Sequence, residues 1–335
     1  MATVLLIDNF KIFEKWASKT YEFKLKQLKD DTRFDVIDID ELKDVDITKY
    51  KTLIFGWNLC IYSKYYTLKH AFYSKKIKGL ETFSEIKAKT KNILQFPKKY
   101  LIVQDFINAD DYQYGLKSLI LYLKNCKFKG IITPYLNTPA TQPVRNELPE
   151  LEIVHLPHHI DENKFKNWEL EKDCDIFIYG NCKSARYPFR HRILQILKKL
   201  DSEKKCKIVF WNDLMSRNYF RYNAGISNEN LSKQINKSWL TVCTCSYADA
   251  LLGKYFETSM SNSCLLGNMA SDGKKIWKDN YIKIEEEMKD EEIEKIILTS
   301  LENKDLLKKN IEKMSKLVKT YYLSKIGDRL YYGLR

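Results

Sequence analysis

The sequence predicts an α/β protein of two domains, each built on a parallel β-sheet with helices on both faces. The chain has 335 residues, enough for two ordinary domains, and 44% of them are apolar, enough for two cores. Short apolar runs of strand length recur along the whole chain, and amphipathic segments of helix length separate them. This alternation is typical of parallel sheets covered by helices.

Eleven apolar runs are the predicted strands, and they fit two sheets of five or six strands better than a single sheet of eleven. They cover residues 3–8, 34–40, 52–57, 100–106, 130–135 and 152–157 in the first half, and 174–180, 206–211, 240–246, 263–268 and 281–286 in the second.

Three of the separating segments are predicted helices. In residues 188–200 the side chains of Ile193, Leu194 and Leu197 share one helical face. Residues 247–260 have helix formers and apolar spacing suited to a helix directly after the strand at 240–246. Residues 302–335 are long, basic and helical in pattern, and we expect their end to cross back onto the first domain.

The domain boundary is predicted near residue 160. In residues 156–173 the apolar periodicity lapses, Pro157 interrupts the chain and charges accumulate. We therefore expect a first domain at 1–158, a second at 159–310 and a C-terminal helix at 311–335 that packs on the first.

The charge of +13 comes from 57 basic and 44 acidic residues spread along the chain. No basic stripe interleaved with aromatics is present, so nucleic acid is a disfavoured partner. A solvated surface is the simplest interpretation, and a small basic cleft for a phosphorylated molecule is compatible with the same charge.

The eight cysteines are scattered, mostly in apolar runs, and form no C-x-x-C pair. Buried reduced thiols fit a reducing compartment, so the prediction is a soluble cytoplasmic protein. No stretch of eighteen apolar residues predicts a transmembrane segment. The composition, rich in Lys, Ile, Asn and Tyr, is compatible with an AT-rich genome such as a viral one.

The carboxyl ends of the strands are the predicted ligand-binding edges, because open parallel sheets bind ligands there. Ser246, at the end of the strand at 240–246, is therefore a candidate for binding the nucleotide sugar. An acidic pair, Asp249 and Glu257, follows the strand at 240–246. If both were helical they would lie about 80° apart around the axis and about 12 Å apart along it, suited to different parts of one extended ligand. A carboxylate can accept hydrogen bonds from the vicinal hydroxyls of a ribose.

Each acid also has a purely structural interpretation. Ser246 and Asp249 have the spacing of a capping box, which would only close a helix start. Glu257 could be a solvated helical residue, but its flanks Tyr255, Phe256 and Met260 favour a half-buried position, where an unpaired carboxylate is costly.

A diphosphate site is predicted after the strand at 174–180. Gly180 permits a tight turn, and Lys183, Arg186 and Arg190 lie close to the helix start at Pro188. Basic residues there oppose the helix dipole unless an anion lies between them. Lys183 and Arg186 are the first choices, and the alternative is that all three face water.

The sequence resembles the GT-B glycosyltransferases, especially the group similar to the spore maturation protein CgeB. The resemblance is strongest over 152–325, and four stretches carry it: "LPHHIDENKF", "DIFIYGNCKSARYPFRHRIL", "INKSWLTVCTCS" and "KYFETSMSNSCLLGN". By this resemblance Glu257 would hold the nucleotide ribose, Asp249 would approach the donor sugar and Lys254 would match a basic residue of the family. The chain has Asp249 where the family has Glu, and Asn262 near a common Gly.

The resemblance implies two Rossmann-like domains facing across a cleft, with the nucleotide-sugar donor in the second and the acceptor in the first. It implies transfer of a sugar from a UDP- or GDP-linked donor to a glycan, protein or small hydroxyl-bearing acceptor, with retention at the anomeric carbon. No cofactor and no metal are expected, and no D-x-D in the sequence looks committed to a divalent ion.

An acceptor base is expected from the first domain. Asp105 and Asp8 each follow a predicted strand, although capping of the strand end is the other role open to them. His158 and His159 lie at the domain junction and are expected to line the interdomain cleft. With His155 they suggest zinc, but no fourth ligand has a useful spacing.

Two rival functions follow from the same sequence. One is a non-catalytic nucleotide- or nucleic-acid-binding protein that uses the positive charge. The other, a dehydrogenase, is disfavoured because "IDNFKIF" after the first strand lacks the G-x-G-x-x-G turn.

Overall fold

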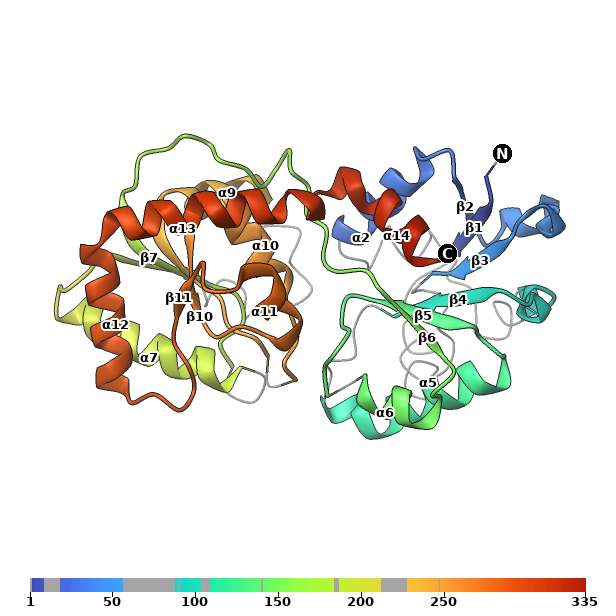
Figure 1. The fold of residues 1–335 in the computed structure, drawn as a ribbon, viewed down its shortest axis with the longest axis horizontal. Coiled ribbons are helices and arrows are strands. Elements are labelled where there is room, and N and C mark those ends of the chain that lie inside the picture. Colours follow the sequence, from blue (N-terminus) through green and yellow to red (C-terminus); the bar gives the residue numbers. More distant parts are fainter. Residues whose placement is uncertain are drawn as a thin grey trace, which may run out of the picture. The chain divides into compact units, whose positions relative to one another are not determined.

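The structure, a computed structural model, describes residues 2–8, 19–56, 88–89, 91–103, 109–139, 141–183, 187–211, 228–246 and 248–335 (Figure 1). The chain divides into two compact units. One contains Met1–Pro157 together with Ser324–Arg335, and the other contains His158–Leu323.

The first unit is built on a six-stranded sheet in the order β2-β1-β3-β4-β5-β6. Every neighbouring pair of these strands is parallel. The strands are β1 (Val4–Asp8), β2 (Phe34–Asp38), β3 (Thr52–Phe55), β4 (Lys99–Ile102), β5 (Gly130–Thr133) and β6 (Glu152–His155), and the described α-helices are α2 (Lys19–Lys29), α5 (Ala109–Asn125), α6 (Gln142–Glu147) and α14 (Ile326–Gly333).

The second unit is built on a five-stranded sheet in the order β11-β10-β9-β7-β8, again with parallel neighbours. Its strands are β7 (Cys174–Tyr179), β8 (Ile208–Trp211), β9 (Ser238–Val242), β10 (Cys264–Gly267) and β11 (Ile282–Lys283), and its described α-helices are α7 (Pro188–Ser202), α9 (Asn228–Asn236), α10 (Gly253–Met260), α11 (Ser271–Trp277), α12 (Asp290–Glu302) and α13 (Lys304–Leu317).

The strand order of the second sheet changes direction between β7 and β9. The chain moves from β7 to β8 on one side, and from β9 to β10 on the other. Right-handed crossovers therefore place α7 and α10 on opposite faces of the sheet, as Figure 1 shows. In open parallel sheets ligands bind at the carboxyl ends of the strands where such a reversal occurs, which in this sheet are the ends of β7 and β9.

All eleven predicted strands are present, and their division into a sheet of six and a sheet of five is confirmed. The runs were recognisable because both faces of each sheet are covered, so nearly every residue of a central strand such as β1 or β3 is buried. The helix predicted at 188–200 is also confirmed as α7, with its apolar face in the core.

The prediction of a helix from residue 247 is wrong, because α10 begins at Gly253. The preceding loop has a turn of its own, in which the backbone N–H of Asp249 donates to the Ser246 carbonyl (3.0 Å) and the N–H of Ala248 donates to the Ser246 hydroxyl (3.2 Å). Serine and aspartate side chains offer the backbone such partners in competition with a helix.

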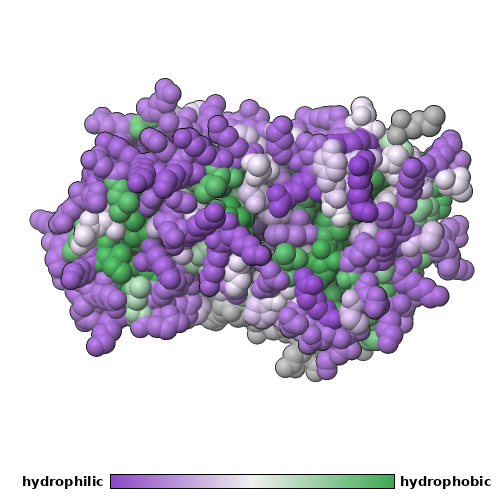
Figure 2. All heavy atoms as spheres, in the orientation of Figure 1, coloured by the Kyte–Doolittle hydropathy of each residue, from purple (hydrophilic) through white to green (hydrophobic). Residues whose placement is uncertain are grey.

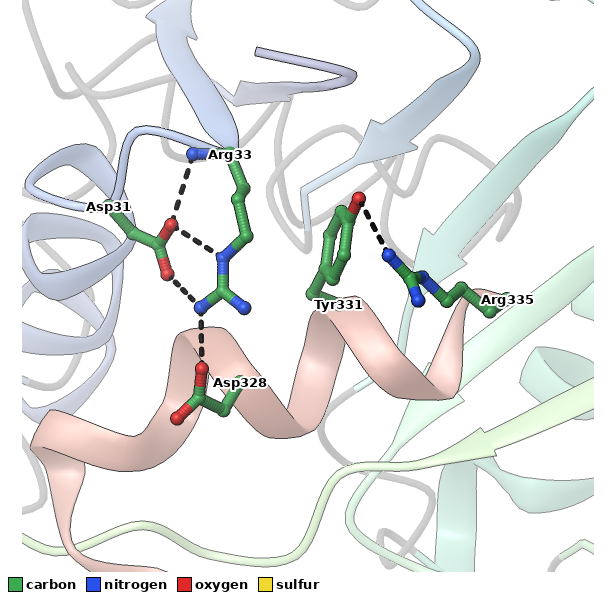
Figure 3. Close-up of polar contacts among 5 residues, drawn as sticks. All are labelled: Asp31, Arg33, Asp328, Tyr331 and Arg335. Atoms are coloured by element: carbon green, nitrogen blue, oxygen red, sulfur yellow. Dashed lines mark hydrogen bonds and ion pairs between the residues drawn. The ribbon is translucent and has the colours of Figure 1, made fainter. Parts of the chain in front are cut away.

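The single helix expected near the C-terminus is two helices. α13 belongs to the second unit, and α14 joins the first unit, where it packs against α2 and β6. Arg33 anchors α14 through its guanidinium, which donates to Asp31 and to Asp328 Oδ1 at 2.7 Å (Figure 3). Leu330, on the same helix, is fully buried.

The surface accounts for much of the positive charge. Along α13, Lys308, Lys309, Lys313 and Lys316 are exposed, and Figure 2 shows a largely hydrophilic face with small apolar areas. Among the described helices, none is long and apolar enough to cross a membrane.

Candidate functional site

The candidate site lies at the carboxyl end of β7, around Gly180. This residue has a φ of +89°, a left-handed conformation that glycine adopts without strain. A Cβ on Gly180 would lie 3.6 Å from Arg190 Nη1 and 3.7 Å from Lys254 Nζ. Two cationic groups from different helices therefore approach the same point in the turn after β7.

Arg190 is a buried arginine in the first turn of α7, with 2% of its surface exposed. Its Nε donates to Thr244 Oγ1 (3.0 Å), its Nη2 to the Thr244 carbonyl (2.9 Å) and its Nη1 to the Asn181 carbonyl (3.0 Å). Its guanidinium carbon lies 4.2 Å from the centroid of the Tyr187 ring. All three hydrogen-bond acceptors are neutral.

Lys254 is a buried lysine in the first turn of α10, with 7% exposed. Its Nζ donates to the carbonyls of Tyr179 (2.8 Å) and Val242 (3.3 Å), so it bridges the ends of β7 and β9. Burial, followed by the nearby charge of Arg190, lowers the pKa of Lys254 to about 7. Its acceptors are neutral as well.

Glu257 lies one turn after Lys254 on α10 and is half-buried. Its Oε2 accepts a hydrogen bond from the Tyr179 hydroxyl at 2.7 Å. Burial raises the pKa of Glu257, and the Tyr179 hydroxyl and the Lys254 ammonium oppose that rise. The second oxygen, Oε1, lies beside Gly253, 3.6 Å from the position of a Cβ there.

The charges of this site are unbalanced in a way that suits an anion. Within the described residues neither Arg190 nor Lys254 forms an ion pair with a carboxylate, and Glu257 is the carboxylate whose charge raises the pKa of Lys254. Buried cations without a counter-ion are costly. An anionic ligand with a hydroxyl group could satisfy both cations and Glu257 Oε1, which has no donor within the described residues.

Asp249 does not lie on the helix of Glu257. It occupies the loop after β9 with a φ of +51°, and its two carboxylate oxygens accept from the backbone N–H of Ser271 at 3.1 and 3.2 Å. It therefore caps the start of α11. The prediction that Asp249 and Glu257 lie on one helix is wrong. A contact between Asp249 and a ligand stays a prediction.

Ser246 and Lys183 flank the site without joining its charged groups. Ser246 is buried and accepts from the Ala248 N–H, so it forms a turn and no capping box with Asp249. Lys183 is exposed, and its backbone N–H donates to Asn181 Oδ1 at 2.8 Å. Arg186 lies outside the described residues.

The acceptor-base candidates belong to the first unit. Asp8 ends β1 and is fully buried, with its carboxyl group packed over Gly56, where a Cβ would lie 2.1 Å from Asp8 Cγ. Gly56 is therefore needed to make room for this side chain. Asp105 lies outside the described residues.

His158 and His159 begin the second unit. His159 is fully buried, and its ring lies 6.1 Å from that of Tyr321. His158 Cγ lies 3.9 Å from the position of a Cβ on Gly253, which places this ring beside the first residue of α10. His155 is on β6 in the first unit, with Nε2 3.1 Å from the Pro134 carbonyl oxygen. The described residues contain no group of three His, Cys, Asp or Glu that could hold a metal ion.

Sequence reasoning passed over Arg190 as a first choice and missed Tyr179. A signal for Arg190 was present, because it is three residues before Ile193 and four before Leu194, on the apolar face of α7. An arginine on that face has to be buried with acceptors. Tyr179 gave no comparable signal, since an aromatic residue at the end of a strand is ordinary core.

Comparisons of the structure show its fold. It is similar to a sucrose-phosphate synthase from Thermosynechococcus elongatus, with a TM-score of 0.57 and 9% identity over 99% of this chain and 98% of that one. It is similar to Anabaena HepE in complex with UDP and glucose, with a TM-score of 0.55 and 8% identity over 99% of both chains. It is also similar to TarM, with a TM-score of 0.55 and 13% identity over 89% of this chain and 57% of TarM.

No protein-family model and no curated protein sequence matches the chain. The structural likeness covers nearly the whole chain, and both units have the parallel sheets and helices that the resemblance implied. The chain therefore has the fold of the GT-B glycosyltransferases, with two Rossmann-like units.

Proposed function

We propose that this protein is a glycosyltransferase that takes its sugar from a nucleotide-diphosphate donor bound by the second unit. The observation that carries the proposal is the pair of buried cations, Arg190 and Lys254, at the end of β7 beside the carboxylate of Glu257. A nucleoside diphosphate offers the anion that these cations lack and the ribose hydroxyls that a carboxylate accepts.

The cations would also contribute to the reaction. In glycosyl transfer the diphosphate leaves while the anomeric carbon gains positive character. Arg190 is fixed by three hydrogen bonds and Lys254 by two, so both side chains are positioned before the donor binds. Lys183 and Arg186 are further candidates for contacts with the diphosphate.

The structural neighbours favour uridine as the base. HepE is described in complexes with UDP and glucose and with UDP-glucose, and GtfA, with a TM-score of 0.51, in complex with UDP and GlcNAc. We infer that a UDP-sugar is the donor of this protein, with a GDP-sugar as the alternative.

The other parts of the proposal concern the acceptor and the chemistry. We infer that the acceptor is a hydroxyl-bearing glycan, protein or small molecule bound by the first unit, with Asp8 or Asp105 as its base. Asp249 is proposed to approach the donor sugar. Metal independence and retention remain parts of the proposal that rest on the resemblance alone.

A pair of lysine variants tests the donor site. Lys254→Met removes the proposed phosphate ligand. Lys172→Met is the matched control, because Lys172 also donates from a half-buried ammonium to backbone carbonyls of this unit, those of Asn236 (2.7 Å) and Ser238 (2.9 Å), at the opposite ends of the strands. Burial lowers the pKa of Lys172 to about 8, so each of the two substitutions removes a lysine amine whose pKa is lowered by burial.

The measurement is the thermal stabilisation of each protein by UDP, GDP and their glucose conjugates. We expect the wild type and Lys172→Met to gain about 5 °C or more at saturating UDP. Lys254→Met and Glu257→Gln should each lose affinity about tenfold or more. Absence of stabilisation of the wild type by any of these nucleotides would remove the proposal, and equal losses in the two lysine variants would remove the role of Lys254.

Hydrolysis or transfer separates the enzyme from a non-catalytic binder. The glycosyltransferase releases UDP from UDP-sugar slowly in water and faster with an acceptor. The alternative is a nucleotide-binding protein without this activity. It would be favoured if UDP stabilises the protein but no UDP is released from any of the sugar conjugates with a panel of glycan acceptors.

A further inference from the structure

Tyr179, the last residue of β7, contacts both charged groups of α10. Its carbonyl oxygen accepts from Lys254 Nζ at 2.8 Å, and the same Nζ lies 4.1 Å from the centroid of its ring. Its hydroxyl donates to Glu257 Oε2 at 2.7 Å. One buried side chain thus connects the end of the strand to a cation and a carboxylate.

The ring of Tyr179 has little freedom to move. It is 4% exposed and stacks on Phe177, with ring centroids 5.2 Å apart and planes at 13°. Phe177 is held in turn by an edge contact with Trp211 (5.2 Å). Burial raises the pKa of Tyr179 well above its usual value, so the phenol stays protonated and can only donate to the carboxylate.

The hydrogen bond leaves the two oxygens of Glu257 unequal. Oε2 is occupied by the Tyr179 hydroxyl, whereas Oε1 has no donor among the described residues. Oε1 faces the side of α10 where Gly253 has no side chain, and where Ile160 and His158 approach within 3.7 and 3.9 Å of the position of a Cβ. We expect a ligand hydroxyl to approach Oε1 from this side of α10.

We propose that Tyr179 is a positioning residue, whose hydroxyl fixes the Glu257 carboxylate so that Oε1 is presented to a hydroxyl of the nucleotide. This inference rests on the proposed function, because it assigns the orientation of a side chain in the donor site. It predicts that the hydroxyl of Tyr179 acts on binding only through Glu257.

Several charged and titratable groups surround this carboxylate. They are Tyr179 on β7, Lys254 on the same helix, Cys243 after β9, and His158 beside Gly253. The hydroxyl of Tyr179 favours the ionised carboxylate, so its removal should raise the pKa of Glu257 further. An ionised Glu257 accepts the ligand hydroxyl, so affinity should fall as the pH falls through that pKa.

The test is a double-mutant cycle on the full chain with UDP as the probe. Tyr179→Phe keeps the ring, its stacking and the contact with Lys254, and removes only the hydroxyl. Tyr100→Phe is the matched control, because in the first unit the buried Tyr100 hydroxyl also donates to a glutamate, Glu152. Dissociation constants are measured by calorimetry at several pH values between 5.5 and 8, and folding is checked by circular dichroism.

Tyr179→Phe should weaken UDP binding about tenfold, and Tyr100→Phe should leave it unchanged. Once Glu257 is replaced, loss of the Tyr179 hydroxyl should have no additional effect. The Tyr179→Phe/Glu257→Gln double variant should therefore bind UDP with the same affinity as Glu257→Gln. Glu257→Gln retains every other titratable group of the site, so its pH dependence is subtracted from that of the other proteins. After this subtraction, the affinity of Tyr179→Phe should begin to fall at a higher pH than the affinity of the wild type.

The possible failures are distinguishable. If the wild type does not bind UDP or GDP, the proposed function falls and the inference falls with it. If the wild type binds UDP and Glu257→Gln weakens binding, but Tyr179→Phe binds like the wild type, only the inference is overturned. The inference alone is likewise overturned if the losses of Tyr179→Phe and Glu257→Gln add in the double variant.

Discussion

Among single residues, Lys254 has the most consequential environment. Its ammonium is buried against backbone carbonyls, and its pKa of about 7 places the change of charge close to neutral pH. A bound diphosphate would favour the charged form, because an anion near an ammonium raises its pKa. Binding of the donor is therefore expected to take up a proton at neutral pH.

The stability of the fold should depend on pH through this residue. The pKa of Lys254 in the folded chain, about 7, is lower than its value of 10.5 in the unfolded chain. Between these two values the unfolded chain binds the extra proton, so the free energy of unfolding rises with pH by up to about 1.4 kcal/mol per unit. Below pH 7 the lysine is charged in both states and its burial cost is present in full.

Urea unfolding of the wild type and of Lys254→Met at pH 6.5, 8 and 9 checks this expectation. The unfolding free energy of the wild type minus that of Lys254→Met should increase as the pH rises. The hydrogen bonds lost in Lys254→Met add a constant to this difference and do not change its dependence on pH. Lys172 is present in both proteins, so its titration cancels. A difference that stays constant with pH would show that the ammonium is not destabilised by burial.

At the scale of elements, the start of α11 depends on a residue far from it in sequence. Asp249 accepts from the Ser271 N–H, which would otherwise be one of the unpaired donors of the first turn. It also holds a φ of +51°, which asparagine and aspartate tolerate better than alanine. The loop after β9 is thus held by both a side-chain bond and a backbone conformation.

Substitutions at Asp249 should separate capping from catalysis. Asp249→Ala should lower the free energy of unfolding by about 1–2 kcal/mol. It removes the cap, and it places at positive φ an alanine, whose side chain cannot form a hydrogen bond there. Asp249→Asn keeps an acceptor oxygen and the tolerated conformation, and should lose less than about 0.5 kcal/mol. Denaturant unfolding of both variants measures these losses.

Activity of Asp249→Asn then decides the second role. If Asp249 contacts the donor sugar as a carboxylate, this stable variant should transfer sugar more slowly. Wild-type transfer rates in Asp249→Asn would limit the residue to its structural role, and equal stability of the alanine variant and the wild type would contradict the cap.

At the scale of the whole molecule, the first unit is completed by a helix from the other end of the sequence. α14 contributes Ile326 and Leu330 to the buried side of that unit, and Leu334 directly after it is buried as well. The Lys98 ammonium donates to the Leu334 carbonyl at 2.8 Å. The ion pair of Arg33 with Asp328 is more visible in Figure 3, but 55% of the Asp328 side chain is exposed. Apolar burial should therefore dominate the docking of α14.

Two substitutions on α14 compare these contributions. Leu330→Ala should lower the unfolding free energy by about 3 kcal/mol, because it leaves a cavity in a fully buried site. Asp328→Asn should cost less than about 1 kcal/mol, since an exposed ion pair contributes little. Urea unfolding followed by circular dichroism gives both values, and a larger loss in Asp328→Asn would reverse the ranking.

The sheets could be predicted from sequence because their strands are buried on both faces. Runs such as Val4–Asp8 and Cys174–Tyr179 are almost entirely apolar, and that pattern does not depend on distant residues. The start of α10 could not be predicted, because it depends on the turn that Ser246 and Asp249 form with nearby backbone groups.

Within the candidate site, the position of Glu257 could be predicted from the sequence. The flanks of Glu257 indicated a half-buried carboxylate after β9, and that is its position. The partner of Asp249, Ser271, could not be inferred, because it is 22 residues away and joined only through the tertiary fold. The role of Tyr179 depends likewise on the register that brings β7 beside α10.

The division of the first unit between both parts of the chain has a consequence for synthesis on the ribosome. The segment Ser324–Arg335 is translated only after all of His158–Leu323 has been made, a delay of roughly 10–30 s at ordinary elongation rates. Throughout that interval the nascent first unit lacks its closing helix, and the apolar surface that Leu330 later covers is open to chaperones. A stop codon anywhere in the intervening stretch would leave that surface uncovered in the truncated product.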